Sequence, residues 1–361
     1  MHIPRPTGRQ IGRALAFAAS LAVFVPVARG VASGNLAGLL GNPLGPVGAE
    51  LVNVPRGSGL ASLDFAEFSG RSGQLRVAFL TRDEVDFVPG LVPRFGPQVR
   101  ETGTRVVPHS DGESDFAFVT LKPWRDKLGT FINKYHVGHW PGERKMMPGN
   151  YGNPAGFIEV TPENADLRLS THFTLRSFIT HDQARTWPKY VVLKEELLDK
   201  LELVLGVLES QGIPTRNVVV LSGFRTPQYN ARVSFEGAAY ASRHQYGDAA
   251  DVIIDANRDG RMDDLNRDGV VDFMDTDVIN RAVEKVERQH PLLVGGLGLY
   301  HAMGPSGPFA HIDVRGTRAR WSNDGTRRAR PQAASASRAT PTGTCKAPPE
   351  FAHLCKARKG N

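Results

Sequence analysis

The sequence predicts a fold that combines helices and strands, with a small all-β module ahead of a mixed domain. Four short runs rich in β-branched and aromatic residues, separated by Gly, Pro and Asp, lie between residues 75 and 121. The segment 191–212 has apolar residues at helical spacing and stops at Gly212, which predicts a strong amphipathic helix. The apolar run 218–224 follows it and indicates a buried strand.

The four β-rich runs are expected to form the strands of the small module. They cover residues 75–80, 87–93, 104–109 and 116–121. Two interpretations of the module's role stay open, because its composition fits a glycan-binding surface as well as a shield over a neighbouring cleft.

Shifts in composition divide the chain into six parts. Gly, Pro and turn signals mark the segments between folded regions, and the last part contains almost no large apolar residues. The predicted parts are a signal peptide at 1–33, a linker at 34–69, the β module at 70–125, an irregular connector at 126–164, a second folded domain at 165–321 and a disordered basic tail at 322–361.

The net charge of +7 comes from the two ends of the chain. Residues 1–33 contain four Arg and no acids, and residues 316–361 contain ten Lys and Arg against two acids, so the part between them is mildly acidic. A nucleic-acid-binding core would carry a basic stripe within the folded domain, and we therefore expect no nucleic-acid partner. The basic tail fits contact with anionic envelope polymers, or a solvated flexible tail.

The N-terminus is typical of a secretory signal. Three arginines precede the apolar run 14–28, and small residues follow it. The run contains a Pro and is short for a membrane span, which favours cleavage over retention as an anchor. The expected location is secreted or periplasmic, with no membrane contact after cleavage.

The two cysteines, Cys345 and Cys355, both lie in the predicted tail. An oxidising compartment favours a disulfide between them over two unpaired thiols. Neither lies in a folded region with a motif, so a cysteine nucleophile is not expected.

Two segments of the second domain contain candidate metal ligands. His244 and Asp251 lie seven residues apart around Gly247, and Asp251 opens an apolar strand. His311 lies in another predicted strand, where Asp313 shares its face. Two imidazoles and one carboxylate suit Zn²⁺ and leave a position open, which is typical of a catalytic site. The alternative is a set of ordinary polar residues at strand ends.

Four motifs in this region resemble the zinc D-Ala-D-Ala carboxypeptidase family, which includes D-Ala-D-Ala dipeptidases and murein endopeptidases. They are SGFRTPQYN (222–230), SRHQYGDAAD (242–251), GGLGLY (295–300) and GPFAHIDVRG (307–316). The family motif Ser-x-His-x-x-Gly-x-Ala-x-Asp is matched by Ser242, His244, Gly247, Ala249 and Asp251, and its later His-x-Asp strand by His311 and Asp313.

This resemblance covers about residues 165–321. It implies an α+β fold in which a central antiparallel sheet with flanking helices carries a zinc ion on His244, Asp251 and His311. It also implies a peptide of peptidoglycan as substrate. We expect the protein to be a monomer.

Arg225 is the expected partner of an anionic substrate or intermediate, because a guanidinium can bind a carboxylate with two hydrogen bonds. The resemblance implies the same role. The alternative is a structural Arg paired with a buried acid.

The group that transfers protons is harder to predict. Some members of the family have a Glu three residues before the last His ligand, where this chain has Pro308. Asp313 could orient a ligand or act on water, and His301 is a second candidate, with a surface-loop His as the alternative interpretation.

An acidic insertion separates the second and third predicted ligands. The pattern D-x-N-x-D-G occurs twice, nine residues apart, and resembles the calcium loops of EF-hand and dockerin-type proteins. The candidate Ca²⁺ ligands are Asp255, Asn257 and Asp259 in the first copy and Asp264, Asn266, Asp268, Asp272 and Asp275 in the second. The alternative is a solvated loop with Asx turns.

Three functional hypotheses follow. The first is an exported zinc metallopeptidase of peptidoglycan stem peptides, of the D-Ala-D-Ala carboxypeptidase type or, alternatively, a murein endopeptidase. The second is a degenerate, non-catalytic protein that binds cell wall, and the third is a calcium-dependent adhesion protein. The intact ligand set favours the first, while the missing Glu keeps the second open.

Overall fold

The computed structural model describes residues 50–51, 63, 65–108, 115–147, 149–234 and 239–325. The predicted signal peptide, most of the predicted linker and nearly all of the predicted tail, with Cys345 and Cys355, lie outside the described residues.

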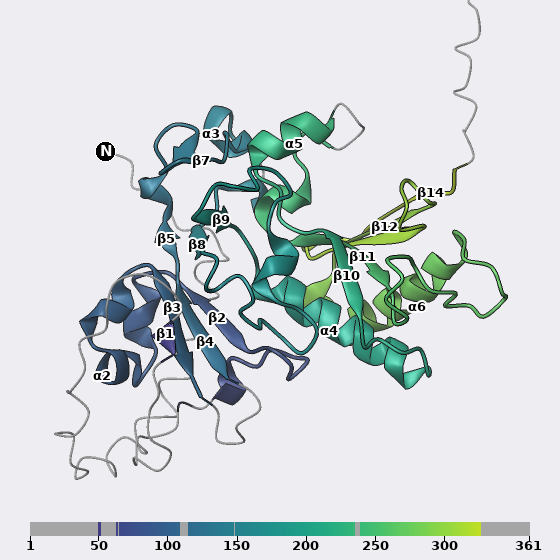
Figure 1. The fold of residues 1–361 in the computed structure, drawn as a ribbon, viewed down its shortest axis with the longest axis horizontal. Helices are drawn as coiled ribbons and strands as arrows, with labels where there is room; N and C mark the ends of the chain where they lie inside the picture. Colours follow the sequence, from purple (N-terminus) through teal and green to yellow (C-terminus); the bar gives the residue numbers. More distant parts are fainter. Residues whose placement is uncertain are drawn as a thin grey trace, which may run out of the picture. The chain divides into compact units, whose positions relative to one another are not determined.

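The first sheet has four strands in the order β1-β3-β4-β2 (Figure 1). β3 and β4 are antiparallel, whereas β1 pairs with β3 and β2 with β4 in parallel. The strands are β1 (Glu50–Leu51), β2 (Val77–Leu80), β3 (Gly103–Val107) and β4 (Phe116–Thr120).

One predicted strand of this module is wrong. Residues 87–93 end a 3₁₀ turn and enter the helix α2 (Leu91–Phe95). Gly90 has a positive φ of 86°, and Pro93 offers no N–H for strand pairing, so the run cannot extend a sheet. The module is therefore not all-β, because helical turns pack beside its sheet.

Short elements connect this module to the rest of the chain. β5, β8 and β9 form a three-stranded antiparallel sheet, and β6 and β7 form a hairpin. Their bounds are β5 (Lys122–Pro123), β6 (Phe131–Ile132), β7 (Tyr135–His136), α3 (Pro141–Arg144), β8 (Gly156–Val160) and β9 (Lys189–Val191).

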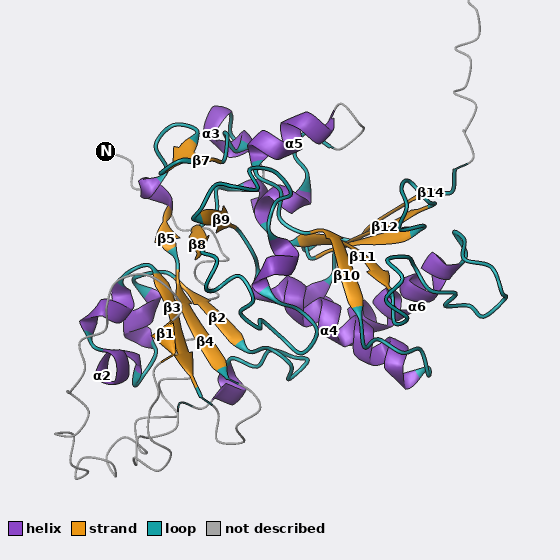
Figure 2. Ribbon diagram, in the orientation of Figure 1, coloured by secondary structure: helices purple, strands orange, loops and turns teal. Residues whose placement is uncertain are grey.

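The second large sheet has five strands in the order β10-β11-β13-β12-β14 (Figure 2). Its first four strands are antiparallel, as the resemblance implies, but β14 pairs in parallel with β12, so the sheet is mixed. The strands are β10 (Val218–Ser222), β11 (Ala249–Ile254), β12 (Gly296–Tyr300), β13 (Phe309–Asp313) and β14 (Ala319–Asn323).

Two long helices flank this sheet. α4 (Glu195–Ser210) packs on α6 (Asp275–Gln289), and α6 contacts β12 and β13. α4 confirms the predicted amphipathic helix but begins later than residue 191, because β9 occupies the residues up to Val191. A shorter helix, α5 (Pro227–Val233), is capped at its N-terminus by Thr226, whose hydroxyl accepts the backbone N–H of Tyr229.

One buried core contains residues from both large sheets. Val77 of β2, Leu198 of α4 and Ile312 of β13 belong to it. Carboxylates of α4 also hold the first module, since Glu195 accepts the N–H of Phe79 at 2.6 Å. None of the helices in the described part of the chain is long and apolar enough to cross a lipid bilayer.

Candidate metal centre

The strand register of the second sheet places a row of functional positions on one face. Cα pairing aligns Ser222 with Asp251, Asp251 with His311, His311 with Gly298, and Gly298 with Trp321. Residues paired in this way point to the same side of a sheet. Strands that are far apart in sequence therefore bring two of the predicted ligands together.

The third ligand comes from a turn next to β11. His244 lies in a 3₁₀ helix, Arg243–Tyr246, which ends at Gly247. Gly247 has a φ of +65°, and a Cβ there would lie 2.2 Å from the carbonyl oxygen of Val192. Only glycine allows this close approach, which explains its place between the two ligands.

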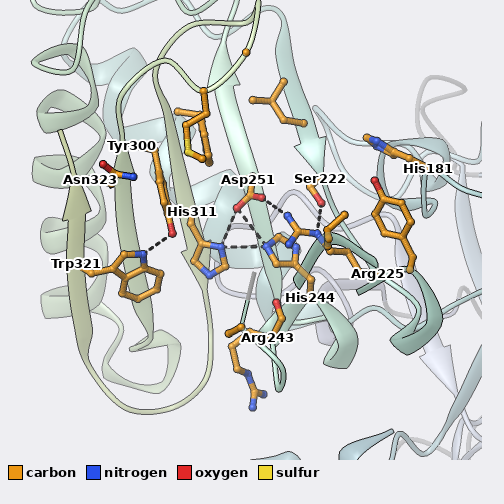
Figure 3. A pocket seen from close by; sticks show the side chains of 18 of the residues that line it. His181, Ser222, Arg225, Arg243, His244, Asp251, Tyr300, His311, Trp321 and Asn323 are labelled. Carbon is orange, nitrogen blue, oxygen red and sulfur yellow. Dashed lines mark hydrogen bonds and ion pairs between the residues drawn. The ribbon is translucent and has the colours of Figure 1, made fainter. Parts of the chain in front are cut away.

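Three ligand atoms from these residues face one another (Figure 3). His244 Nε2 lies 3.1 Å from His311 Nδ1 and 3.3 Å from Asp251 Oδ1, and the last two atoms are 2.9 Å apart. Three ligands of a tetrahedral zinc ion, each about 2.1 Å from the metal, lie about 3.4 Å apart. The three ligand atoms in the structure therefore lie only slightly closer together than the ligands of a bound zinc ion would.

The outer partners of both imidazoles fix the positions of their protons. Nδ1 of His244 lies 2.7 Å from the carbonyl oxygen of Gly223, and Nε2 of His311 lies 3.2 Å from Oδ2 of Asp313. Both partners are acceptors, so these nitrogens carry the protons of neutral rings and the inward nitrogens carry lone pairs. Two lone pairs and a carboxylate oxygen then face one another, and a cation satisfies all three.

Burial and neighbouring charges shift the pKa values of the three ligand side chains. Burial lowers the pKa of His244, which favours the neutral imidazole that a metal requires. Burial alone would raise the pKa of Asp251, but the two imidazoles outweigh it and hold this pKa well below its usual range. Burial also opposes charge on His311, yet hydrogen bonds to Asp251 and Asp313 raise its pKa.

Arg225 lies beside the triad and binds one of its members. Its Nη2 donates to Oδ2 of Asp251 at 2.7 Å, and its Nε donates to Oγ of Ser222 at 2.7 Å. This is the structural alternative weighed from the sequence, and it leaves Oδ1 of Asp251 for the metal position. Arg225 also lines the cleft described below, so its predicted role as substrate clamp stays a prediction.

Asp313 is completely buried, and hydrogen-bond donors surround its carboxylate. It accepts hydrogen bonds from the backbone N–H of Gly296 at 2.6 Å, from the guanidinium of Arg315 and from His311. Burial alone would raise its pKa, but the bonds to His311 and Arg315 hold it far below the usual range. Of the two roles considered for Asp313, the contacts fit the one that orients a ligand.

The structure does not bring His301 to the triad. Its Nδ1 lies 3.0 Å from the carbonyl oxygen of Asn323, and its side chain is not part of the cleft wall. Pro308 is buried and has no ionisable group.

The two acidic loops share one geometry. In the first loop, Asp255 accepts the backbone N–H groups of Asp259 and Gly260, and Asn257 also accepts that of Asp259. In the second loop, Asp264 accepts the backbone N–H groups of Asp268 and Gly269, and Asn266 also accepts that of Asp268. Asp275 closes the second loop by accepting the backbone N–H groups of Leu265 and Asp272. Among the described residues, the only group of three His, Cys, Asp or Glu ligand atoms that converge is His244, Asp251 and His311. The bonds within both loops are those of the Asx-turn alternative, and calcium binding stays a prediction.

A cleft of about 870 Å³ opens over the triad. Its wall contains three side chains that the sequence did not single out, His181, Tyr300 and Trp321. The indole ring of Trp321 lies over Gly298, where a Cβ would be 2.3 Å from Nε1, and its centre is 5.2 Å from that of the His311 ring. In the sequence, the two glycines at 296 and 298, two apart in one strand, could have indicated that bulky side chains lie across β12 at these positions.

A buried triad of two imidazoles and one carboxylate at the floor of an open cleft defines a metal-dependent hydrolytic site. Residues 171–284 match the family model of Peptidase M15. Together with His311, the chain carries the His-Asp-His metal-binding triad of a metallopeptidase. The match includes His244 and Asp251 and ends before His311.

The chain is also similar to one solved structure, the crystal structure of Serratia marcescens L-Ala D-Glu endopeptidase ChiX. The two share 18% sequence identity over 34% of this chain and 82% of that chain, with a TM-score of 0.23. No curated protein matches this chain.

Proposed function

We propose that the protein is an exported zinc metallopeptidase that cleaves peptide bonds of peptidoglycan stem peptides. The observation that carries the proposal is the set of three inward-facing acceptor atoms on His244, Asp251 and His311, whose outer partners fix both imidazoles as lone-pair ligands. Two nitrogens and one oxygen match the donor preference of zinc at catalytic sites. The substrate class comes from the family match and from the motifs of residues 222–316.

The metal and the residues around it would have separate roles in the reaction. When bound, zinc would acidify a water molecule and polarise the scissile carbonyl group. Arg225 fixes the carboxylate of Asp251 through its second oxygen, and Asp313 keeps the proton of His311 on its outer nitrogen. The cleft positions the peptide above these groups.

Within this class, a D-Ala-D-Ala carboxypeptidase is the first candidate and a murein endopeptidase the second. Digestion of purified muropeptides, with products weighed by mass spectrometry, separates the two. Release of free D-Ala identifies a carboxypeptidase, and separation of cross-linked dimers identifies an endopeptidase.

The variant His244→Ala tests the enzyme hypothesis against a degenerate wall-binding protein. We expect it to lose zinc and cleavage together, while Tyr240→Phe, at an exposed tyrosine outside the cleft, keeps both. If the wild-type protein binds zinc but cleaves no muropeptide, the enzyme proposal is overturned.

The proposed structural Ca²⁺ in the loop 255–275 has its own test. A cation that binds only the folded state raises the melting temperature with its concentration. We expect millimolar Ca²⁺ to raise the melting temperature of the wild-type protein and to have less effect on Asp264→Asn. An unchanged melting temperature in the wild-type protein would contradict the calcium proposal.

A further inference from the structure

Tyr300 lies next to the metal triad on the same face of the sheet. It ends β12, two residues after Gly298, which pairs with His311. Side chains two apart in a strand point the same way, and Tyr300 lines the cleft together with His311 and Asp251. Figure 3 shows its hydroxyl between the indole of Trp321 and the imidazole of His311.

Two aromatic neighbours hold the phenol ring in place. The ring of Phe309 stacks on it with centroids 4.7 Å apart and planes 5° from parallel. Nε1 of Trp321 donates a hydrogen bond to the phenol oxygen at 2.7 Å. Trp321 is itself fixed, because it packs over the bare backbone of Gly298 and under the guanidinium of Arg315.

The hydrogen bond from Trp321 sets the direction of the phenol proton. An indole N–H can only donate, so the oxygen of Tyr300 is the acceptor in this bond and its own proton must point elsewhere. Among the described residues the proton has no acceptor. A substrate in the cleft can provide one.

The surroundings keep Tyr300 in its donor form. Burial raises the pKa of the phenol; the bond from Trp321 lowers it, and the negative charge of Asp251 raises it, with a net increase. The hydroxyl therefore keeps its proton at neutral pH.

We propose that the Tyr300 hydroxyl donates a hydrogen bond to the carbonyl oxygen of the scissile peptide bond as that oxygen gains negative charge. No bond to the phenol proton breaks in this step, because the hydroxyl stabilises charge and transfers nothing. Such a donor acts where charge develops, so it lowers the barrier more than it strengthens substrate binding. The inference rests on the proposed peptidase function.

The variant Tyr300→Phe removes the hydroxyl and keeps the ring. With a muropeptide that the wild-type protein cleaves, we expect kcat to fall about 100-fold and KM to change by less than about twofold. Calorimetry of the same peptide on the metal-free proteins should give equal affinities, since the hydroxyl acts on developing charge. Zinc content and melting temperature should match those of the wild-type protein.

Two further variants sharpen the result. Trp321→Phe keeps an aromatic ring but removes the N–H that orients the hydroxyl, and we expect a smaller loss of kcat than for Tyr300→Phe. Tyr240→Phe removes an exposed hydroxyl outside the cleft and should leave all parameters unchanged.

Three outcomes would overturn the inference. A wild-type kcat in Tyr300→Phe means that the hydroxyl has no part in the reaction, while the proposed function stands. A raised KM and weaker calorimetric binding with unchanged kcat mean that Tyr300 only binds substrate. If the wild-type protein cleaves no peptide at all, the proposed function and this inference fail together.

Discussion

At the scale of single residues, the positions of two protons decide what the site can bind. The carbonyl oxygen of Gly223 and the carboxylate of Asp313 each accept a hydrogen bond from the outer nitrogen of an imidazole, and this leaves the inner nitrogens of His244 and His311 as ligands. Loss of the Asp313 carboxylate should therefore alter metal binding without touching a ligand.

Asp313→Asn tests this directly. The amide cannot accept from both His311 and Arg315 as the carboxylate does, and the partly buried guanidinium of Arg315 loses its counter-charge. We expect zinc affinity to fall about 10- to 100-fold, measured by competition with a fluorescent chelator. Asp166→Asn, at an exposed carboxylate paired with Arg176, is the control. Equal affinities in the two variants would show that Asp313 does not support the ligand.

The sequence predicted which three residues converge at the candidate metal site, because they belong to spaced motifs whose residue types suit a metal. It could not predict the target of Arg225, since both a substrate and a buried acid attract a guanidinium. The choice of Asp251 depends on the register between β10 and β11, which pairs Ser222 with Asp251. The sequence did not indicate Tyr300 and Trp321 for the same reason, because their contact depends on the strand order β13-β12-β14.

At the scale of elements, the glycines of β12 leave room for the side chains that cross it. In Gly298→Ala the new Cβ would lie 2.3 Å from Nε1 of Trp321, so the indole must move. We expect a loss of about 1–3 kcal/mol in the free energy of unfolding and a shift in tryptophan fluorescence.

Gly206→Ala provides the matched control. Gly206 is exposed in α4, and a Cβ there meets nothing within 4 Å. Alanine should stabilise the helix by about 0.5–1 kcal/mol. If Gly298→Ala is as stable as the wild-type protein in chemical denaturation, the packing account of β12 is wrong.

The pair of His172 and Glu202 ties the segment before α4 to that helix. The hydrogen bond to the carboxylate, at 2.7 Å, raises the pKa of His172, and burial opposes it only in part. A raised pKa stabilises the fold below the unfolded value, about 6.5, and this contribution is lost as the pH rises through the folded value.

His172→Ala should therefore destabilise the protein more at about pH 5.5 than at about pH 9, where the wild-type imidazole is neutral. Urea denaturation of both proteins at the two pH values measures the difference. A loss of stability that is the same at both would show that the ionised pair contributes nothing.

Element types were predicted better than their boundaries. The spacing of apolar residues correctly indicated a helix within 191–212 and a strand at 218–224, because burial of one face enforces that spacing. The run 87–93 was misread, since its apolar residues pack as well from a helical turn as from a strand, and Gly90 and Pro93 decide between them.

At the scale of the whole molecule, the β module and the metallopeptidase domain share one buried core, and a second, smaller cluster belongs to the β module alone. Side chains of β2, α4 and β13 lie in the same buried cluster. Asp199 of α4 accepts the backbone N–H groups of Arg71 and Ser72, which lie between β1 and β2 of the first sheet. The sequence suggested two parts because composition changes between them, but side-chain packing does not follow that change.

A shared core predicts one cooperative unfolding transition for the described region. Scanning calorimetry should show a single peak, and amides of β4 and β11 should exchange with equal free energies of opening. Two peaks, or much earlier exchange in β4, would mean that the first module unfolds independently.

The central claim is that His244, Asp251 and His311 hold one zinc ion. Native mass spectrometry of the purified wild-type protein and of Asp251→Ala measures this most directly. The account predicts one zinc per chain in the wild-type protein and none in the variant, with both proteins folded. A wild-type protein that binds no zinc at micromolar metal, or a variant that keeps its zinc, would contradict it.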